Sequence, residues 1–330
     1  MKDEEPPNTR VRPGRWRPRR LLLRITAWGA GLVVLTAGAG FLYETAARQD
    51  DAGRHLPPGR LVNVGGHRLH LHCTGRGAPT VVLEAGLAES SASWETIQRG
   101  LATGNRVCSY DRAGYAWSED SPLPRTAEHL AEELRTLLAV AGEAGPYVLI
   151  GHSYGGNTVR VFADRWRNLT AGLVLIDVTD ETAETALRIS RPLISAQFTL
   201  SQLIARLGLL RLLDDVFVPA DATATARAHA TVVYGSSSMA AGRAEAWASV
   251  DSAAQIRATV RPKAWGDLPV VVISAGGQPP EAVAHARSLA ALSARGRLVV
   301  ADTTEHYVQN AQPDLVLDAI GEVVAAHRKS

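Results

Sequence analysis

The sequence lacks the motifs that would indicate a bound nucleotide. Its 330 residues contain no Gly-rich loop ending in Gly-Lys-Ser or Gly-Lys-Thr and no Gly-x-Gly-x-x-Gly fingerprint; these patterns place backbone N–H groups around phosphates. A metal site is also not indicated. His67, His70 and His72 lie close together, but no acidic residue stands at a clear ligand spacing from them. We therefore expect no nucleotide, flavin or metal cofactor.

Basic residues outnumber acidic ones by eight to three in the first 24 residues of the chain. Residues 1–24 carry a net charge of +5, whereas the whole chain carries only +2, so the remainder sums to −3. The basic balance belongs to this terminal segment and gives the rest of the chain no positive face for nucleic acid. We expect no nucleic-acid partner.

A long apolar run follows, ITAWGAGLVVLTAGAGFLY at residues 25–43, with no charge in 19 positions. A helix of this length crosses a hydrocarbon layer of about 30 Å. Arginines on its N-terminal side alone predict an inside N-terminus and an exported body. We expect a basic cytoplasmic tail (1–24), a transmembrane anchor or signal segment (25–43) and a linker (44–59). An uncleaved anchor is favoured; cleavage at the small residues 37–39, or a twin-arginine signal at Arg19-Arg20, would give a secreted protein.

From residue 60 onward, short apolar runs alternate with helix-length stretches. The first two flank a Gly-Gly hairpin, and six continuous Val/Ile/Leu-rich runs follow. Continuous apolar runs between helices indicate a parallel sheet covered on both faces. The predicted strands are residues 60–64, 67–73, 80–85, 106–110, 147–151, 172–177, 268–275 and 297–302. We expect an α/β domain over 60–330 with a mostly parallel, eight-stranded sheet.

One interval is too long for a crossover helix. Residues 181–266 show helical patterns but no convincing strand. We expect a helical cap insertion there, lying over the carboxyl edge of the sheet, where ligands bind in such folds.

The stretch IGHSYGG, residues 150–156, lies between a predicted strand and a predicted helix. Gly-x-Ser-x-Gly in that setting is typical of a nucleophile elbow, a sharp turn that exposes the serine Oγ. Glycines two residues before and two after the serine avoid clashes with the neighbouring strand and helix. We predict that Ser153 is the nucleophile and that the N–H of Tyr154 is one oxyanion donor.

A serine hydroxyl needs a base that a carboxylate orients. His306 is the histidine that follows the last predicted strand, and we predict it as the base. The acid is less determined, because the usual position, after the strand at 268–275, holds only Glu281. Asp177 ends the preceding strand and is favoured, with Asp180 and Glu281 as alternatives.

A second oxyanion donor should come from the loop after the strand at 80–85. There Gly86 lets the backbone turn close to a substrate, so we assign the N–H of Leu87. Loss of one such donor costs about 3 kcal/mol of transition-state stabilisation.

From residue 60 to the end, the chain resembles the α/β-hydrolase family. The resemblance is carried by LEAGL at 83–87 with Trp94, by YDRAGY at 110–115 with Trp117, and by the elbow and His306. It implies the α/β-hydrolase fold, but it does not determine the substrate, since this fold hosts many chemistries.

The resemblance also implies a possible disulfide, and the sequence differs from the family pattern at two positions. The family's strand order would make the strands of Cys73 and Cys108 neighbours, which would allow a disulfide; two buried free thiols are the alternative. The usual acid position is empty, and Ala116 stands where a glycine is common.

These features predict a serine hydrolase that acts on small or apolar carboxylic esters outside the cytoplasm. Ser153 would attack, His306 would shuttle the proton, and Asp177 would steady the imidazolium. An amidase or peptidase of the same fold and a non-catalytic binding module are the alternatives.

Overall fold

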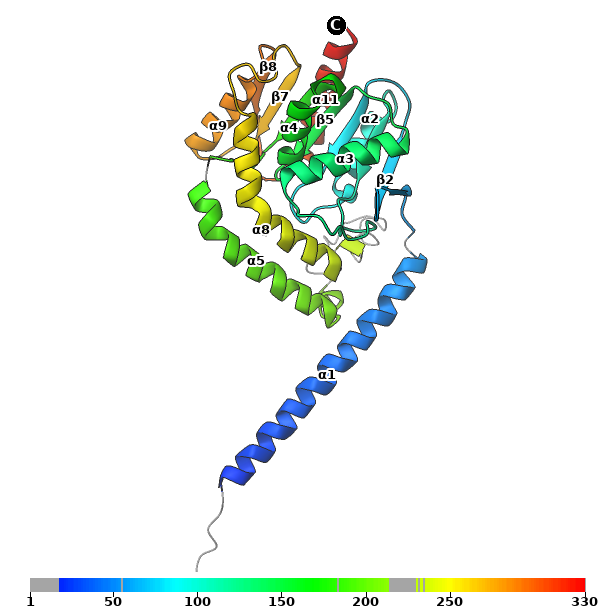
Figure 1. The fold of residues 1–330 in the computed structure, drawn as a ribbon, viewed down its shortest axis with the longest axis vertical. Helices are drawn as coiled ribbons and strands as arrows, with labels where there is room; N and C mark the ends of the chain where they lie inside the picture. The colour runs from blue at the N-terminus through cyan, green and yellow to red at the C-terminus, as the bar shows by residue number, and fades with distance from the viewer. Residues whose placement is uncertain are drawn as a thin grey trace, which may run out of the picture.

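The computed structural model describes residues 18–54, 56–182, 184–213, 230, 232–233 and 235–329 (Figure 1). Most of the expected basic tail, residues 1–17, and residues 214–229 of the expected cap lie outside this part of the chain.

One eight-stranded sheet forms the centre of the body, in the order β1-β2-β4-β3-β5-β6-β7-β8. Strand β2 is antiparallel to β1 and β4, and all other neighbours are parallel. The strands are β1 Arg60–Asn63, β2 Arg68–Thr74, β3 Thr80–Glu84, β4 Val107–Tyr110, β5 Tyr147–His152, β6 Thr170–Ile176, β7 Val270–Ser274 and β8 Gly296–Val300. The predicted α/β-hydrolase architecture is confirmed.

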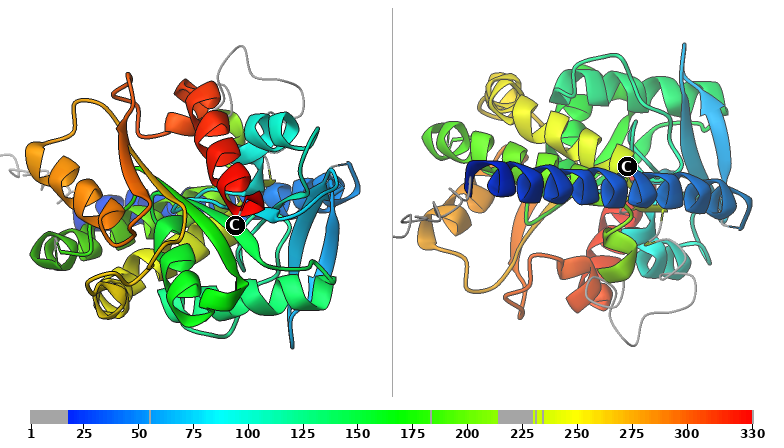
Figure 2. Two further views of the ribbon diagram at one scale, coloured as in Figure 1. Left: turned by 90° about the horizontal axis from the view of Figure 1, so that it is seen from above. Right: turned by 90° about the horizontal axis from the view of Figure 1, so that it is seen from below.

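Helices cover both faces of the sheet (Figure 2). One core layer joins the sheet to α3, α4 and α9, and the other joins it to α2 and α11. The central strands β3, β5, β6 and β7 are buried at every position, as their continuous apolar sequences require. The body helices are η1 Ser91–Trp94, α2 Glu95–Leu101, α3 Ala127–Ala141, α4 Gly155–Arg165, η2 Arg167–Leu169, α9 Pro280–Ala290, α10 Val308–Ala311 and α11 Pro313–Arg328.

Cys73 and Cys108 face each other across the antiparallel pair β2 and β4 and are joined by a disulfide. A disulfide of this kind persists in oxidising compartments and is rare in the cytosol.

The chain between β6 and β7 forms helices α5 (Glu184–Arg206), η3 (Leu210–Leu213) and α8 (Ser236–Thr259). Helices α5 and α8 lie side by side on one side of the body (Figure 1). They are the described part of the segment expected to form a cap.

The N-terminal helix α1 spans Pro18–Arg54. Within it, Leu22–Asp51 has the length and composition of a membrane-crossing helix. The expected linker 44–59 is therefore helical as far as Arg54. Alanines and the i,i+4 ion pairs Glu44–Arg48 and Asp50–Arg54 favour this extension, and Pro57 and Pro58 lie just beyond its end.

Candidate active site

Ser153 occupies a sharp turn between β5 and α4. Its φ is 49°, a left-handed conformation that costs a non-glycine residue about 1–3 kcal/mol and that concentrates at functional sites. The turn is held by the N–H of Ser153, which donates to the carbonyl of Ile176 at 2.9 Å. A Cβ at Gly151 would lie 2.8 Å from the Cα of Gly156, and one at Gly155 would overlap the carbonyl oxygens of the β3 end. Only glycine fits at these two positions, which explains the Gly-x-Ser-x-Gly pattern.

His306 lies in the loop between β8 and α10, and its ring is about half exposed. Its Nδ1 lies 2.7 Å from Oδ2 of Asp177. This contact raises the pKa of His306 above its ordinary value, because the carboxylate stabilises the imidazolium more than partial burial disfavours it. Since Asp177 engages Nδ1, Nε2 is the nitrogen that remains for proton transfer.

Asp177 follows β6 directly and has a φ of 44°. Its carboxylate accepts hydrogen bonds from the N–H of Ala275 at 3.0 Å and from the amide of Gln278 at 3.2 Å. Partial burial would raise the pKa of Asp177, but the hydrogen bonds from His306 and Ala275 outweigh it and hold the pKa below its ordinary value. The carboxylate therefore stays ionised beside His306.

The two alternative acids lie elsewhere. Asp180 accepts a hydrogen bond from the N–H of Thr182 and lies 3.4 Å from His285. Glu281 is in the first turn of α9. Among the described residues, neither has a contact with His306. The loop after β7, the usual position of the acid, instead supplies Gln278, which supports Asp177.

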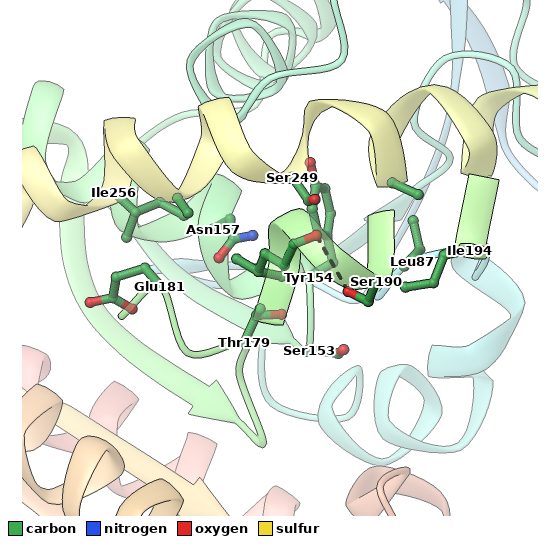
Figure 3. Close-up of a pocket in the computed structure, with 13 residues that line it drawn as sticks. Leu87, Ser153, Tyr154, Asn157, Thr179, Glu181, Ser190, Ile194, Ser249 and Ile256 are labelled. Atoms are coloured by element: carbon green, nitrogen blue, oxygen red, sulfur yellow. Dashed lines mark hydrogen bonds between the residues drawn. The ribbon is translucent and has the colours of Figure 1, made fainter. Parts of the chain in front are cut away.

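Ser153 lines two adjoining cavities. One, of about 120 Å³, is mainly apolar and is enclosed by the cap; its lining includes Leu87, Ile194 and Ile256 (Figure 3). The other, of about 240 Å³, is more polar and also borders Asp177 and His306. The described hydrogen bonds include none between the Ser153 hydroxyl and His306. Such bonds are often loose in sites without substrate.

The two expected oxyanion donors both border Ser153. Leu87 and Tyr154 line the apolar cavity with it, and the hydrogen bonds of the described residues include none from the backbone N–H of either. Tyr154 begins the turn into α4, where N–H groups have no intrahelical partner. The two residues predicted as oxyanion donors thus lie at the cavity that Ser153 borders.

A buried ion network fixes the loop that carries Leu87. Arg112 donates to the carbonyls of Ala85 and Gly86 at 2.5 and 2.7 Å. The same guanidinium donates to the carboxylate of Glu84 at 2.7 Å and to that of Glu245, in α8, at 2.8 Å. Burial raises the pKa of Glu84 to about 7 against the opposing effect of Arg112. Arg112 thereby joins the loop that carries Leu87 to helix α8 of the cap.

A second histidine stands beside the first. His152, fully buried in the elbow, lies 2.8 Å from Oε1 of Glu89 through Nδ1 and 3.0 Å from the carbonyl of His306 through Nε2. Burial would raise the pKa of Glu89, but His152 and the N–H of Gly86 outweigh this and lower it. Glu89 and Glu245 were not found from the sequence, because their partners lie 63 and 133 residues away and no local motif marks them.

The sheet order and the Gly-x-Ser-x-Gly turn after β5 are those of an α/β-hydrolase fold. The chain belongs to the α/β-hydrolase family: the family profile described as alpha/beta hydrolase fold matches residues 79–310.

Among curated proteins, the chain is similar to the uncharacterized protein C23C11.06c of Schizosaccharomyces pombe, with 27% identity over 81% of this chain and 56% of that protein. The matches to the first four curated relatives cover 20, 42, 46 and 41% of their lengths. Many solved structures share the fold, among them an enol-lactonase and an epoxide hydrolase. The enol-lactonase of Burkholderia xenovorans LB400 has 22% identity and a TM-score of 0.60 over 81% of this chain and 100% of its own. The epoxide hydrolase CorEH has 21% identity and a TM-score of 0.61 over 81% of this chain and 98% of its own.

Proposed function

We propose that the chain is a serine hydrolase that cleaves carboxylic esters of small apolar acids through an acyl-enzyme intermediate. One observation carries the proposal. A serine held at φ 49° in the elbow shares a cavity with a histidine whose Nδ1 lies 2.7 Å from a partly buried carboxylate. A nucleophile, a base and an orienting acid that border one cavity support nucleophilic acyl transfer.

In the proposed first half-reaction, Ser153 Oγ attacks the carbonyl carbon and Nε2 of His306 accepts the hydroxyl proton. The N–H groups of Leu87 and Tyr154 bind the oxyanion. The tetrahedral intermediate then collapses, the bond to the alcohol oxygen breaks, and His306 gives its proton to the leaving alcohol. In the second half-reaction, water loses a proton to His306 and attacks the acyl carbon. The bond between the acyl carbon and Ser153 Oγ then breaks, His306 returns its proton to Oγ, and the acid leaves.

The residue at the elbow supports ester hydrolysis over other chemistries of the fold. Lactonase and epoxide hydrolase structures resemble this chain to the same degree, so the fold does not decide between them. Ser153 supports ester hydrolysis, because the members of this fold that resemble dehalogenases and epoxide hydrolases have aspartate at the elbow.

The two cavities support a small apolar acyl group. An apolar cavity of about 150 Å³ is large enough for benzene, so the cavity of about 120 Å³ suits a short acyl chain. The leaving alcohol would occupy the more polar cavity on the His306 side.

We also propose that α1 anchors the protein in a membrane with the hydrolase body outside the cytoplasm. The apolar segment Leu22–Asp51, the arginines before it and the Cys73–Cys108 disulfide support this topology.

The decisive test is labelling of the full-length protein in membranes with a fluorophosphonate probe, which reacts only with an activated serine. We expect labelling of the wild type and of Ser288→Ala, a matched change at an exposed serine of α9. We expect none of Ser153→Ala. Labelling that persists in Ser153→Ala, or a folded wild type that stays unlabelled, would contradict the proposal.

A further inference from the structure

The cap helix α5 has an apolar face that the described residues do not cover. Ile189 and Leu193 are each 74% exposed, Leu200 is 58% and Leu203 is 55% exposed. Their spacing of 4, 7 and 3 residues places them on one side of the helix. A contiguous exposed apolar surface of this kind marks an interaction site.

The opposite side of α5 is already used. Leu187, Ser190 and Ile194 line the apolar cavity beside Ser153, and Phe198 packs against Gly242 of α8. Helix α5 therefore separates the cavity from whatever lies against its outer face.

The C-terminal end of α5 rests on α1. Gly40 lies so close to the carbonyl of Leu207 that a Cβ would be 2.5 Å from it, and Tyr43 packs on Gly208. Arg211 of η3 forms ion pairs with Glu44 and Asp51 of α1, both at 2.6 Å. The contacts begin at the end of the apolar run 25–43, where a membrane helix leaves the hydrocarbon.

The direction of α5 fits a position along a membrane surface. Figure 1 shows α5 running crosswise to α1, on the side of the body from which α1 extends. A helix that crosses the direction of a membrane-spanning helix, at the level where that helix emerges, lies in the plane of the interface.

The charges of α5 agree with this placement. The helix contains Arg188, Arg191 and Arg206 against Glu184 as its only acid. Arg188 and Arg206 flank the outer face, whereas Arg191 lies on the opposite side of α5, where it stacks on the half-exposed ring of Trp247. Basic residues beside an apolar face, with tryptophan nearby, are typical of helices that bind the interface of anionic bilayers.

We propose that the outer face of α5, formed by Ile189, Leu193, Leu200 and Leu203, docks onto the lipid bilayer in which α1 is anchored. The docked cap holds the apolar cavity at the level of the headgroups. An apolar ester dissolved in the bilayer then reaches Ser153 without crossing bulk water. The docking rests on the proposed membrane anchor, and this last step rests on the proposed hydrolase activity.

Depth-dependent quenching tests the docking without any reference to activity. The two cysteines of the chain are joined in one disulfide, so an introduced cysteine supplies a single thiol for a fluorophore. The full-length protein carrying Leu193→Cys or Leu200→Cys is labelled and reconstituted into phosphatidylcholine–phosphatidylglycerol vesicles, with or without nitroxide lipids. Val140→Cys, an exposed position at the end of α3, is the control in water, and Leu35→Cys, in α1, is the control in lipid.

We expect nitroxide lipids to quench the probes at positions 193, 200 and 35 and to leave the probe at 140 unchanged. Probes on α5 that behave like the probe at 140, while the probe at 35 is quenched, would overturn the proposal. Crosslinking of Leu193→Cys between copies, with no quenching by lipid, would also overturn it and assign the face to a second copy of the chain.

A kinetic test addresses substrate entry. In Leu193→Gln/Leu200→Gln, we expect hydrolysis of a bilayer-dissolved ester to fall about tenfold as the buried apolar area is lost. Hydrolysis of a short water-soluble ester should stay within about twofold of the wild type. Equal effects on both esters would contradict entry from the bilayer. Failure of every variant and the wild type on the soluble ester would instead contradict the proposed function, and quenching would still decide the docking.

Discussion

Two histidine–carboxylate pairs lie next to each other at the elbow. His306 is 2.7 Å from Asp177, and His152 is 2.8 Å from Glu89. The two rings are 4.7 Å apart. Similar chemical groups at similar distances are thus arranged in two different environments.

The difference lies in burial and in the second ring nitrogen. The ring of His306 is half exposed and borders the polar cavity, and its Nε2 is not engaged by Asp177. His152 is fully buried, and both of its nitrogens face protein acceptors, Glu89 and the carbonyl of His306. The first pair has the open nitrogen that the proposed proton transfer requires, whereas both nitrogens of the second pair face protein atoms. A histidine beside a carboxylate is therefore not evidence of a base until its free nitrogen is located.

The largest expected effect is the loss of the His306–Asp177 pair. In Asp177→Asn we expect kcat/KM to fall about 10²–10⁴-fold, because an amide no longer orients the imidazole or stabilises the imidazolium. Steady-state hydrolysis of a short aryl ester measures this. Asp180→Asn and Glu281→Gln should stay within about twofold, since neither acid touches His306. A large loss in Glu281→Gln with activity kept in Asp177→Asn would assign the acid to α9.

The second pair should give a smaller effect of another kind. Glu89 contacts His152 and the N–H of Gly86. Because His152 contacts the carbonyl of His306, Glu89 helps to position both His306 and the loop that carries Leu87. In Glu89→Gln we expect kcat to fall about tenfold with KM nearly unchanged, because the reacting groups are displaced while the acyl cavity is kept. The free energy of unfolding should fall by about 1–3 kcal/mol.

Rates expressed per site titrated with fluorophosphonate separate this positioning role from simple loss of folded protein. Glu95→Gln, at the start of the neighbouring helix α2, is the matched control and should change neither value. Unchanged kcat per titrated site in Glu89→Gln would restrict Glu89 to stability.

The two pairs also show what the sequence can predict. The strands and the class of sheet follow from apolar runs in the sequence. The elbow follows from two glycines, Gly151 and Gly155, at which a side chain would clash with neighbouring atoms. The position of His306 follows from chain order. Asp177 was only favoured over Asp180 and Glu281, because its contact depends on a left-handed turn at φ 44° and on Gln278 from another loop.

Contacts between distant segments were out of reach of these patterns. Glu245 in α8 looks like any helical glutamate, yet it lies fully buried against Arg112 and Arg125. The extension of α1 to Arg54 was also missed, since polarity suggested a linker although alanines and ion pairs favour a helix. Local propensity and long-range pairing decide such segments, and hydrophobic patterning alone does not.

The smallest expected effects are shifts in the pH profile of kcat/KM when the carboxylate of either pair is replaced. General-base catalysis needs neutral His306, so kcat/KM should fall as the pH drops through its raised pKa, which lies above 6.5. The same pair stabilises the folded state fully below about pH 6.5 and loses this contribution as the pH rises through the folded pKa.

Variants are needed to show which group causes the acidic limb, the fall in kcat/KM at low pH, because burial raises the pKa of Glu84 to about 7, in the same range. In Asp177→Asn the limb should move to lower pH, since the main cause of the raised His306 pKa is removed. Glu89→Gln should move it in the same direction by a smaller amount, because the charge of Glu89 is the weakest of the causes that raise the pKa of His306. Profiles of kcat/KM between about pH 5 and 9, on an ester whose leaving group does not titrate there, measure both shifts. A limb that stays in place in Asp177→Asn would mean that a group other than His306 controls it, and the comparison between the two histidines would lose its chemical basis.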